Sequence, residues 1–259
     1  MFSMRRPVLL VCAALALGWQ APSQAQPAEL KIFGMDSRPV SFQHDGRPDG
    51  MAVELAAAIE HRIGRSDDIE IIPWARAYTM SQTAPNVLLL SMVRTPERAR
   101  YLTFVGPIFV AYLSVFAPRD RAAQLRGLGP EALHQLRGGA QRGSVVIELA
   151  RDAGFNVVDE TNTSETAARM LMMRRFDLWF DGEEVAADAL RQAGYARDDV
   201  EVVQRLRSEN VYFAFSRGTP EQTVAAWDAA LRELKRDGGY QKILRKWMPA
   251  AMLPVEERR

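Results

Sequence analysis

The fold is decided by residues 86–109, which read NVLLLSMVRTPERARYLTFVGPIF. Residues 87–90 form an unbroken apolar run, which is typical of a strand covered on both faces of a sheet. Residues 95–97 (TPE) then supply an N-cap residue, a proline suited to a first helical position and an acid in the first turn. The pattern therefore predicts a buried strand that leads directly into a helical turn.

Three polar residues lie where this strand ends, namely Ser91, Arg94 and Arg98. In α/β sheets, ligands bind at the carboxyl ends of the strands. A fixed guanidinium beside a hydroxyl and free backbone N–H groups can hold a carboxylate. The local sequence leaves open whether Arg94 and Arg98 hold such a ligand or are solvated surface cations.

Residues 1–25 are predicted to be a secretory signal peptide. Arg5 and Arg6 give a basic start, residues 8–19 form an apolar run, and residues 23–25 (SQA) form a small-x-small cleavage site. The apolar run is shorter than the roughly 20 residues that span a bilayer, and no later segment resembles it. We therefore expect an exported, periplasmic protein.

The composition of the mature chain limits which partners, metals and cofactors it can be expected to bind. Cleavage leaves 234 of the 259 residues and removes Cys12, the only cysteine, so the fold must be stabilised by its core. The 31 basic and 32 acidic residues nearly balance, which argues against nucleic acid or an anionic membrane as a partner. Three histidines without metal-binding spacing predict no metal site, and no cofactor is expected.

Strands alternating with helices predict an α/β fold built on parallel, doubly wound sheets. In the first part of the chain, strands are expected at 29–34, 69–73 and 86–92, with helices at 51–63 and 75–82 and a loop at 38–50. A second, smaller unit is expected to have strands at 111–117, 176–180 and 201–203, helices at 129–136, 145–153, 164–174 and 183–193, and a glycine-rich turn at 138–144. A strand at 211–216 and two helices up to residue 247 complete the chain.

No linker-like segment separates these two units, which predicts two lobes joined by two crossings. The crossings are expected near residues 109–112 and 210–213. Lobe 1 would then comprise residues 26–109 and 214–259, and lobe 2 residues 110–213.

Five short motifs carry a family resemblance: GMAVEL (50–55), PWAR (73–76), RTPER (94–98), FVGPI (104–108) and LKRDGGYQKILRKW (234–247). In this order and spacing the chain resembles the bacterial extracellular solute-binding proteins of family 3, the polar amino acid-binding type that serves ATP-driven importers. The resemblance covers nearly the whole mature chain. It implies a type II periplasmic binding protein-like fold, whose two lobes, each a mainly parallel sheet flanked by helices, close on a small solute.

The resemblance also implies ligand-binding roles in lobe 1. Arg98 matches the arginine that grips the ligand α-carboxylate, with Ser91 at the matching strand end. Phe42 or Trp74 would cover the ligand. Arg94 is an additional cation, so the ligand carries an extra negative charge or Arg94 belongs to a structural ion pair.

In lobe 2, the resemblance assigns Gly143 and Ser144 to a small-residue helix start whose N–H groups suit the same carboxylate. Asp181 occupies the place of the acid that meets the ligand α-ammonium group. Glu183 is the alternative, because a shift by one residue is possible at this point.

The leading interpretation is a monomeric solute-binding protein that presents an amino acid or related carboxylate to a membrane permease complex, with no catalytic residue. A periplasmic dehydratase or lyase on the same scaffold is the second interpretation. Such an enzyme needs an acid or base in the cleft. The histidines are poor candidates, since only His44 could reach the cleft, so Asp181 or Glu183 would take this role. A solute sensor for a receptor kinase is the third. The sequence does not separate transport from sensing.

Overall fold

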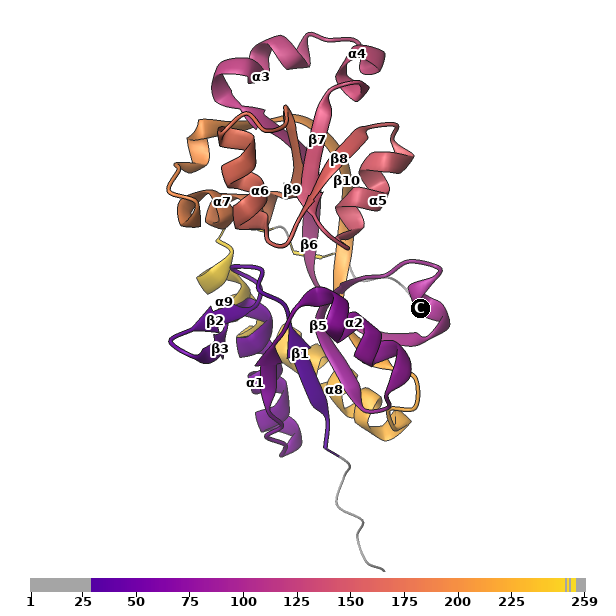
Figure 1. Cartoon of the computed structure of the whole chain (residues 1–259). Coiled ribbons are helices and arrows are strands. Elements are labelled where there is room, and N and C mark those ends of the chain that lie inside the picture. The colour runs from indigo at the N-terminus through magenta and orange to yellow at the C-terminus, as the bar shows by residue number, and fades with distance from the viewer. Residues whose placement is uncertain (1–28, 250, 252, 255–259) are drawn as a thin grey trace, which may run out of the picture.

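The computed structural model describes residues 29–249, 251, 253 and 254. Two α/β lobes are joined by two long strands, β6 (Leu102–Pro118) and β10 (Val200–Ser216), which run from one lobe into the other (Figure 1). The two strands pair antiparallel over their whole length. The predicted signal peptide lies outside the described residues. Within the described part of the chain, no helix combines the length and the apolar character needed to cross a bilayer.

Lobe 1 is built on β1 (Lys31–Gly34), which pairs in parallel with β4 (Ile69–Ile71) on one side and β5 (Val87–Val93) on the other. The apolar run of residues 87–90 is buried on both faces of the sheet, because Leu88 and Leu90 pack in the cluster that contains Trp227, whereas Val87 and Leu89 pack with Ala77. The elements of this lobe are β1 (Lys31–Gly34), β2 (Phe42–His44), β3 (Arg47–Asp49), α1 (Met51–Ile63), β4 (Ile69–Ile71), α2 (Trp74–Thr83), β5 (Val87–Val93), the short 3₁₀ helix η1 (Arg98–Arg100), α8 (Glu221–Arg236) and α9 (Gly239–Trp247).

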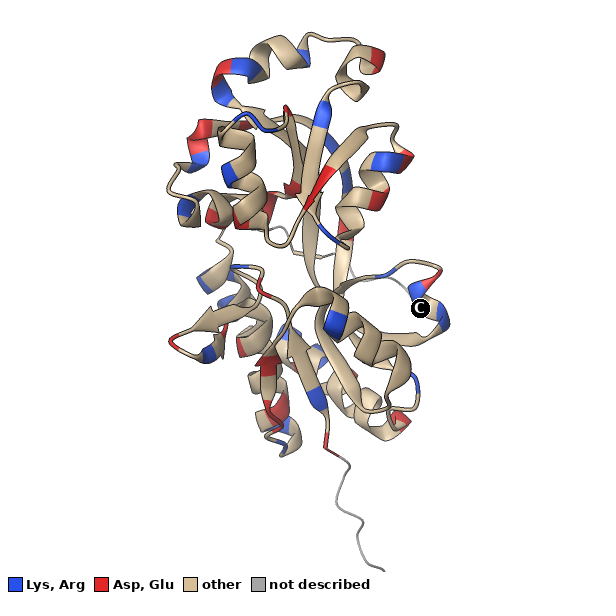
Figure 2. Cartoon of the chain, viewed as in Figure 1, with Lys and Arg blue, Asp and Glu red and all other residues tan. Residues whose placement is uncertain are grey.

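Lobe 2 is built on β7 (Arg137–Gln141), which pairs in parallel with β8 (Asn156–Thr161) and β9 (Leu178–Gly182), and β9 pairs antiparallel with β6. Its further elements are α3 (Arg119–Arg126), α4 (Pro130–His134), α5 (Val145–Asp152), α6 (Ser164–Met172), α7 (Glu183–Gln192) and η2 (Arg197–Asp199). Charged residues of both signs are distributed over the helices of both lobes (Figure 2).

The predicted fold class is confirmed. The strands lie in the order β4-β1-β5-β10-β6-β9-β7-β8, with parallel pairs at both ends and the antiparallel pairs formed by β6 and β10 in the middle. The lobe boundaries predicted from the sequence, after residues 109 and 213, fall within these two middle strands.

The helical turn expected after residues 95–97 is the 3₁₀ helix η1, and Thr95 Oγ1 accepts the Arg98 N–H at 3.2 Å as a capping residue would. One local prediction was wrong. The glycines of the expected turn at 138–144 lie mostly in strand β7. A Cβ at Gly138 would overlap the Phe180 ring and a Cβ at Gly139 the Phe176 ring, so these glycines serve close packing of aromatic side chains rather than a turn.

The chain also has strands where the sequence predicted none or shorter ones. β8, with alternating exposed and half-buried residues, was not predicted, and β2 and β3 form a hairpin within the expected loop at 38–50. The strands expected at 201–203 and 211–216 are one continuous strand, β10. Charged residues such as Arg205 and Glu209 break the apolar pattern of β10 because this part of the strand is not covered on both faces.

Candidate ligand-binding site

A cavity of about 160 Å³ lies between the two lobes. Lobe 1 contributes the ends of its strands and the start of α2, and lobe 2 contributes the starts of α5 and α7. The lobes are in contact at its edge, since a Cβ built on Gly143 of lobe 2 would lie 2.6 Å from Trp74 Cδ1 of lobe 1. The structure therefore represents a closed arrangement around this cavity.

Arg98 lines the cavity and is 94% buried, with a relative exposure of 6%. The turn after β5 directs its side chain back to the strand end, where Nη1 donates a hydrogen bond to the Val93 carbonyl at 3.1 Å. Its Cζ lies 5.6 Å from the Trp74 ring and 5.7 Å from the Tyr78 ring, within the range of cation–π attraction. These contacts fix the guanidinium in position without neutralising its charge.

Ser91 and Trp74 also line the cavity from lobe 1. Ser91 is a half-buried residue within β5, and Trp74 is the first residue of α2. The Trp74 ring stacks on Tyr78 with 5.0 Å between ring centroids, and this contact fixes the ring on the lobe 1 side of the cavity. Tyr78, which supports both Trp74 and Arg98, was missed by the sequence analysis because nothing in its motif distinguishes it from other helical aromatics.

Gly143 and Ser144 line the cavity from lobe 2 at the N-terminus of α5. Gly143 has a φ of +73°, which glycine adopts without strain, and Ser144 is the N-cap residue. The Ser144 hydroxyl is buried and has no hydrogen-bond partner among the described residues. A polar group from a ligand would satisfy it, and the adjacent helix N-terminus favours an anion.

Asp181 lines the cavity from the end of β9 and is buried. Oδ1 accepts the Gly182 N–H at 2.8 Å, whereas Oδ2 is buried and unpartnered within the described part of the molecule. Burial raises the pKa of Asp181 from 3.8 to about 6, against the smaller opposing effect of hydrogen bonds. The Ser164 and Trp179 side chains favour the ionised form of this carboxylate, and a positively charged donor would favour it more strongly.

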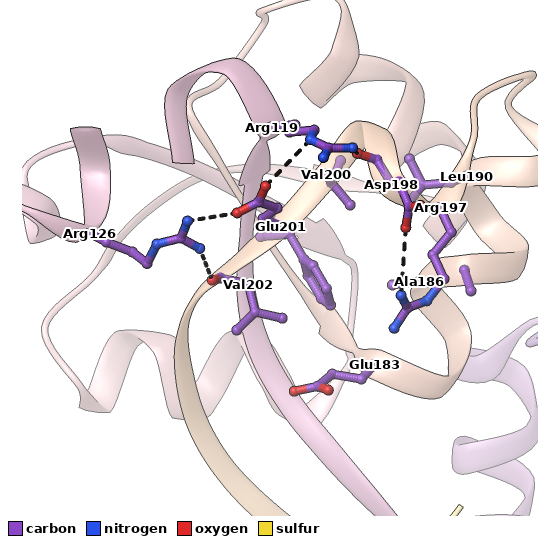
Figure 3. Close-up of a pocket in the computed structure, with 12 residues that line it drawn as sticks. Arg119, Arg126, Glu183, Ala186, Leu190, Arg197, Asp198, Val200, Glu201 and Val202 are labelled. Atoms are coloured by element: carbon purple, nitrogen blue, oxygen red, sulfur yellow. Dashed lines mark hydrogen bonds and ion pairs between the residues drawn. The ribbon is translucent and has the colours of Figure 1, made fainter. Parts of the chain in front are cut away.

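Glu183, the predicted alternative to Asp181, does not line the interlobe cavity but lies among the residues of another pocket in lobe 2 (Figure 3). Its carboxylate accepts hydrogen bonds from Ser114 Oγ and Arg205 Nε, each at 2.7 Å. It borders a separate pocket of about 440 Å³, where Arg126 Nη2 lies 2.7 Å from Glu201 Oε2. The acids of that pocket are paired with arginines, since Arg119 also lies near Glu201, Arg197 lies near Asp198, and Glu183 is paired with Arg205.

Glu184, which the sequence analysis did not propose, lines the interlobe cavity instead of Glu183. It is half-buried, and its carboxylate accepts the Tyr112 backbone N–H at 3.3 Å. Both glutamates belong to the first turn of α7, so only the rotation of that turn decides which one faces the cleft. The sequence carries no clear signal for that choice.

Two other residues proposed from the sequence do not line this cavity. Arg94 is exposed and lies over Phe104, with 6.0 Å from Cζ to the ring centroid, in a different pocket of lobe 1. Phe42 is buried against Trp247 and beneath Arg38, and it borders a second interlobe pocket. Arg98, Ser91, Trp74, Gly143, Ser144 and Asp181 are the proposed residues that the structure brings together.

The charged side chains that line the cavity from within the protein lack ion-pair partners. Arg98 and Asp181 are buried and Glu184 is half-buried, yet none of the three has an ion-pair partner among the residues that the structure describes. Buried charges without partners are unfavourable in a finished structure, so such a set indicates a place where a ligand supplies the missing charges. The described residues contain no group of three or more side chains suited to hold a metal ion.

The unliganded protein is expected to gain stability as the pH falls from about 7.5 to about 4.5. Because Asp181 has a raised pKa of about 6, the folded state binds its proton at a higher pH than the unfolded state does. Its contribution over this interval is about 2 kcal/mol. Urea denaturation of the wild type and of Asp181→Asn at both pH values isolates this effect from Glu60 and Glu184, whose pKa values burial raises to about 7. An identical pH dependence in the two proteins would contradict the assignment.

Two lobes that close on a cavity with unpaired charges define a two-lobe solute-binding protein. The sequence model of the bacterial extracellular solute-binding proteins, family 3, matches residues 32–250, and the chain belongs to this family. The resemblance stated from the motifs is thereby confirmed.

Solved structures share the fold at low sequence identity. The sensor domain of a histidine kinase with similarity to periplasmic binding proteins has a TM-score of 0.76 and 22% identity, over 87% of this chain and 98% of that one. The ancestral amino acid-binding protein AncCDT-1, a precursor of cyclohexadienyl dehydratase, has a TM-score of 0.70 and 22% identity, over 84% and 94%. The substrate binding protein of an amino acid ABC transporter has a TM-score of 0.69 and 18% identity, over 85% and 99%. No curated protein sequence matches the chain.

Proposed function

We propose that this protein is a monomeric periplasmic solute-binding protein that captures an amino acid or a related small carboxylate and delivers it to an ABC-type permease complex. The observation that carries the proposal is the set of unpaired charges in the interlobe cavity, with Arg98 on one lobe and Asp181 on the other. A zwitterion would compensate a cation and an anion at once. It would also link the lobes, so binding would favour the closed state.

The chemistry of the cavity supports this ligand class. The Arg98 guanidinium and the N-terminus of α5 would hold the ligand carboxylate, and Ser144 would donate its hydroxyl. Asp181 Oδ2 would accept from the ammonium group. The volume of about 160 Å³ lies below the roughly 300 to 1,000 Å³ of sites for drug-sized ligands, which favours a single amino acid over a peptide.

Thermal unfolding with a panel of amino acids and small dicarboxylates tests the proposal, after refolding to remove any carried-over ligand. A compound present at about 100 times its dissociation constant should stabilise the fold by about 2.7 kcal/mol. Isothermal titration calorimetry on each compound that raises the melting temperature gives its affinity. Absence of a shift with every member of the panel would refute binding of this ligand class.

One observation favours an enzyme as the second candidate. Asp181 combines a position in the cavity with a pKa near 6, and a general acid or base needs both. Mass spectrometry of each stabilising compound after long incubation separates the two functions. Unchanged recovery supports binding, whereas loss of water or cleavage supports a dehydratase or lyase. A sensor role would be supported by a receptor kinase, rather than permease components, copurifying with the protein.

A further inference from the structure

Glu184 stands between two pockets that both lie where the lobes meet. It lines the cavity that contains Arg98 and Asp181, and it also lines a neighbouring pocket of about 300 Å³. That second pocket has contributions from both lobes, including Phe42 of lobe 1 and Asp188 of lobe 2. Because the two pockets share Glu184, the part of a ligand that extends from the first toward the second must pass this carboxylate.

The cations of the second pocket are paired with a different acid. Arg38 Nε lies 3.9 Å from Asp188 Oδ2, and Arg191 forms an ion pair with the same carboxylate. Glu184 receives the Tyr112 backbone N–H. Desolvation is the main cause that raises the pKa of Glu184 to about 7, and the nearby acids Glu183 and Asp181 add to it. The charged groups that act on Glu184 are therefore themselves negative.

A charge count shows what a simple zwitterion would leave uncompensated. The cavity contains two carboxylates, on Asp181 and Glu184, and one buried guanidinium, on Arg98. Arg142 also borders it, but its side chain is 66% exposed and its Nε lies 3.6 Å from Glu160 Oε2. An α-amino acid group supplies one anion and one cation, so Glu184 would be left without a counter-ion and would be partly protonated at neutral pH, because its pKa is about 7. A cationic group on the ligand would instead stabilise its ionised form.

We propose that Glu184 is a specificity-determining residue that selects amino acids with a second positive group, an amine or a guanidinium, on the side chain. This inference rests on the proposed function, since it takes the amino acid group of the ligand to lie between Arg98 and Asp181. Glu184 then forms the counter-charge for the far end of the ligand. The apolar residues around it, such as Leu113 and Val185, contact the methylene groups that separate the two ends.

Two pairs of nearly isosteric ligands test the proposal by calorimetry: arginine with citrulline, and lysine with norleucine. The wild type should bind the charged member of at least one pair about thirtyfold or more tightly than its neutral partner. In Glu184→Gln the preference should fall to about threefold or less, with the affinity for the neutral member retained. Glu183→Gln is the matched control, because Glu183 is paired with Arg205 outside the cavity, and it should keep the wild-type preference.

The outcomes are distinguishable from failure of the proposed function. Binding of neutral amino acids as tightly as of their charged partners by the wild type would overturn the role of Glu184 and leave the solute-binding function standing. A preference that persists in Glu184→Gln, in a variant whose circular dichroism matches the wild type, would also overturn it. If no member of either pair and no amino acid of the panel binds, both proposals fail.

Discussion

Arg98→Ala is expected to lower the affinity for the ligand by about thirtyfold to several thousandfold, the range found when one partner of a buried charge pair is removed. The reason is the fixed placement of Arg98, which is buried, anchored to the Val93 carbonyl and close to the stacked rings of Trp74 and Tyr78. Water that enters the space left by the substitution cannot supply the lost positive charge. Calorimetric titration with the best ligand of the panel measures the loss.

Arg94→Ala is the control for this variant. It removes an arginine from the same turn, but one that is exposed and lies over Phe104 in a different pocket. Its affinity should stay within about twofold of the wild type, as expected for exposed charges. Equal losses in both variants would indicate general damage to the turn, and an undiminished affinity in Arg98→Ala would remove Arg98 from the site.

Gly143→Val is expected to weaken binding by about 5-fold to 150-fold, which corresponds to an overpacking cost of about 1–3 kcal/mol placed on the closed state. A Cβ at Gly143 would lie 2.6 Å from Trp74 Cδ1 and 2.8 Å from Trp74 Nε1. The Trp74 ring has little room to move, because it stacks on Tyr78. Small-angle scattering with saturating ligand should show a larger radius of gyration than the liganded wild type.

Gly194→Val is the control that distinguishes hindered closure of the lobes from backbone strain as the cause of the lost affinity. Gly194 has a φ of +88°, similar to the +73° of Gly143, and also belongs to lobe 2, but a Cβ there would meet nothing within 4 Å. Both variants should lose similar global stability, since both place a branched residue at positive φ. Only Gly143→Val should lose affinity. The same loss in both variants would assign the effect to strain rather than to contact between the lobes.

The fold could be predicted where local pattern and burial agree. The apolar run of β5 and the periodicity of α1, which ends at Gly64 in a left-handed conformation, indicate their structure without tertiary information. The glycines of β7 could not be assigned, because their reason is the presence of Phe176 and Phe180, which lie far along the chain. The length of β10 was underestimated for a similar reason, since its pairing with β6 stabilises a polar stretch that has weak strand character of its own.

The residues of the candidate site could likewise be predicted only in part from the local sequence. Motifs predicted several residues that line the cavity, among them Arg98, Ser144 and Asp181, because each is placed at the end of a strand or the start of a helix. The sequence does not show whether Glu183 or Glu184 faces the cleft, because a rotation of the first turn of α7 by one residue position would place the other side chain there. Arg94 differs from Arg98 only in which side of a short turn it occupies.

The route of the chain through the two lobes has a practical consequence for reporting ligand capture by fluorescence. β1, near the start of the described chain, and α9, near its end, both belong to lobe 1, while lobe 2 is inserted between β6 and β10. Fluorescent proteins fused to the two ends would therefore travel with the same lobe and register little of the closing movement. A useful pair of dyes needs one attachment point on lobe 1 and one on an exposed loop of lobe 2, such as the turn at Gly194, where a side chain has open space.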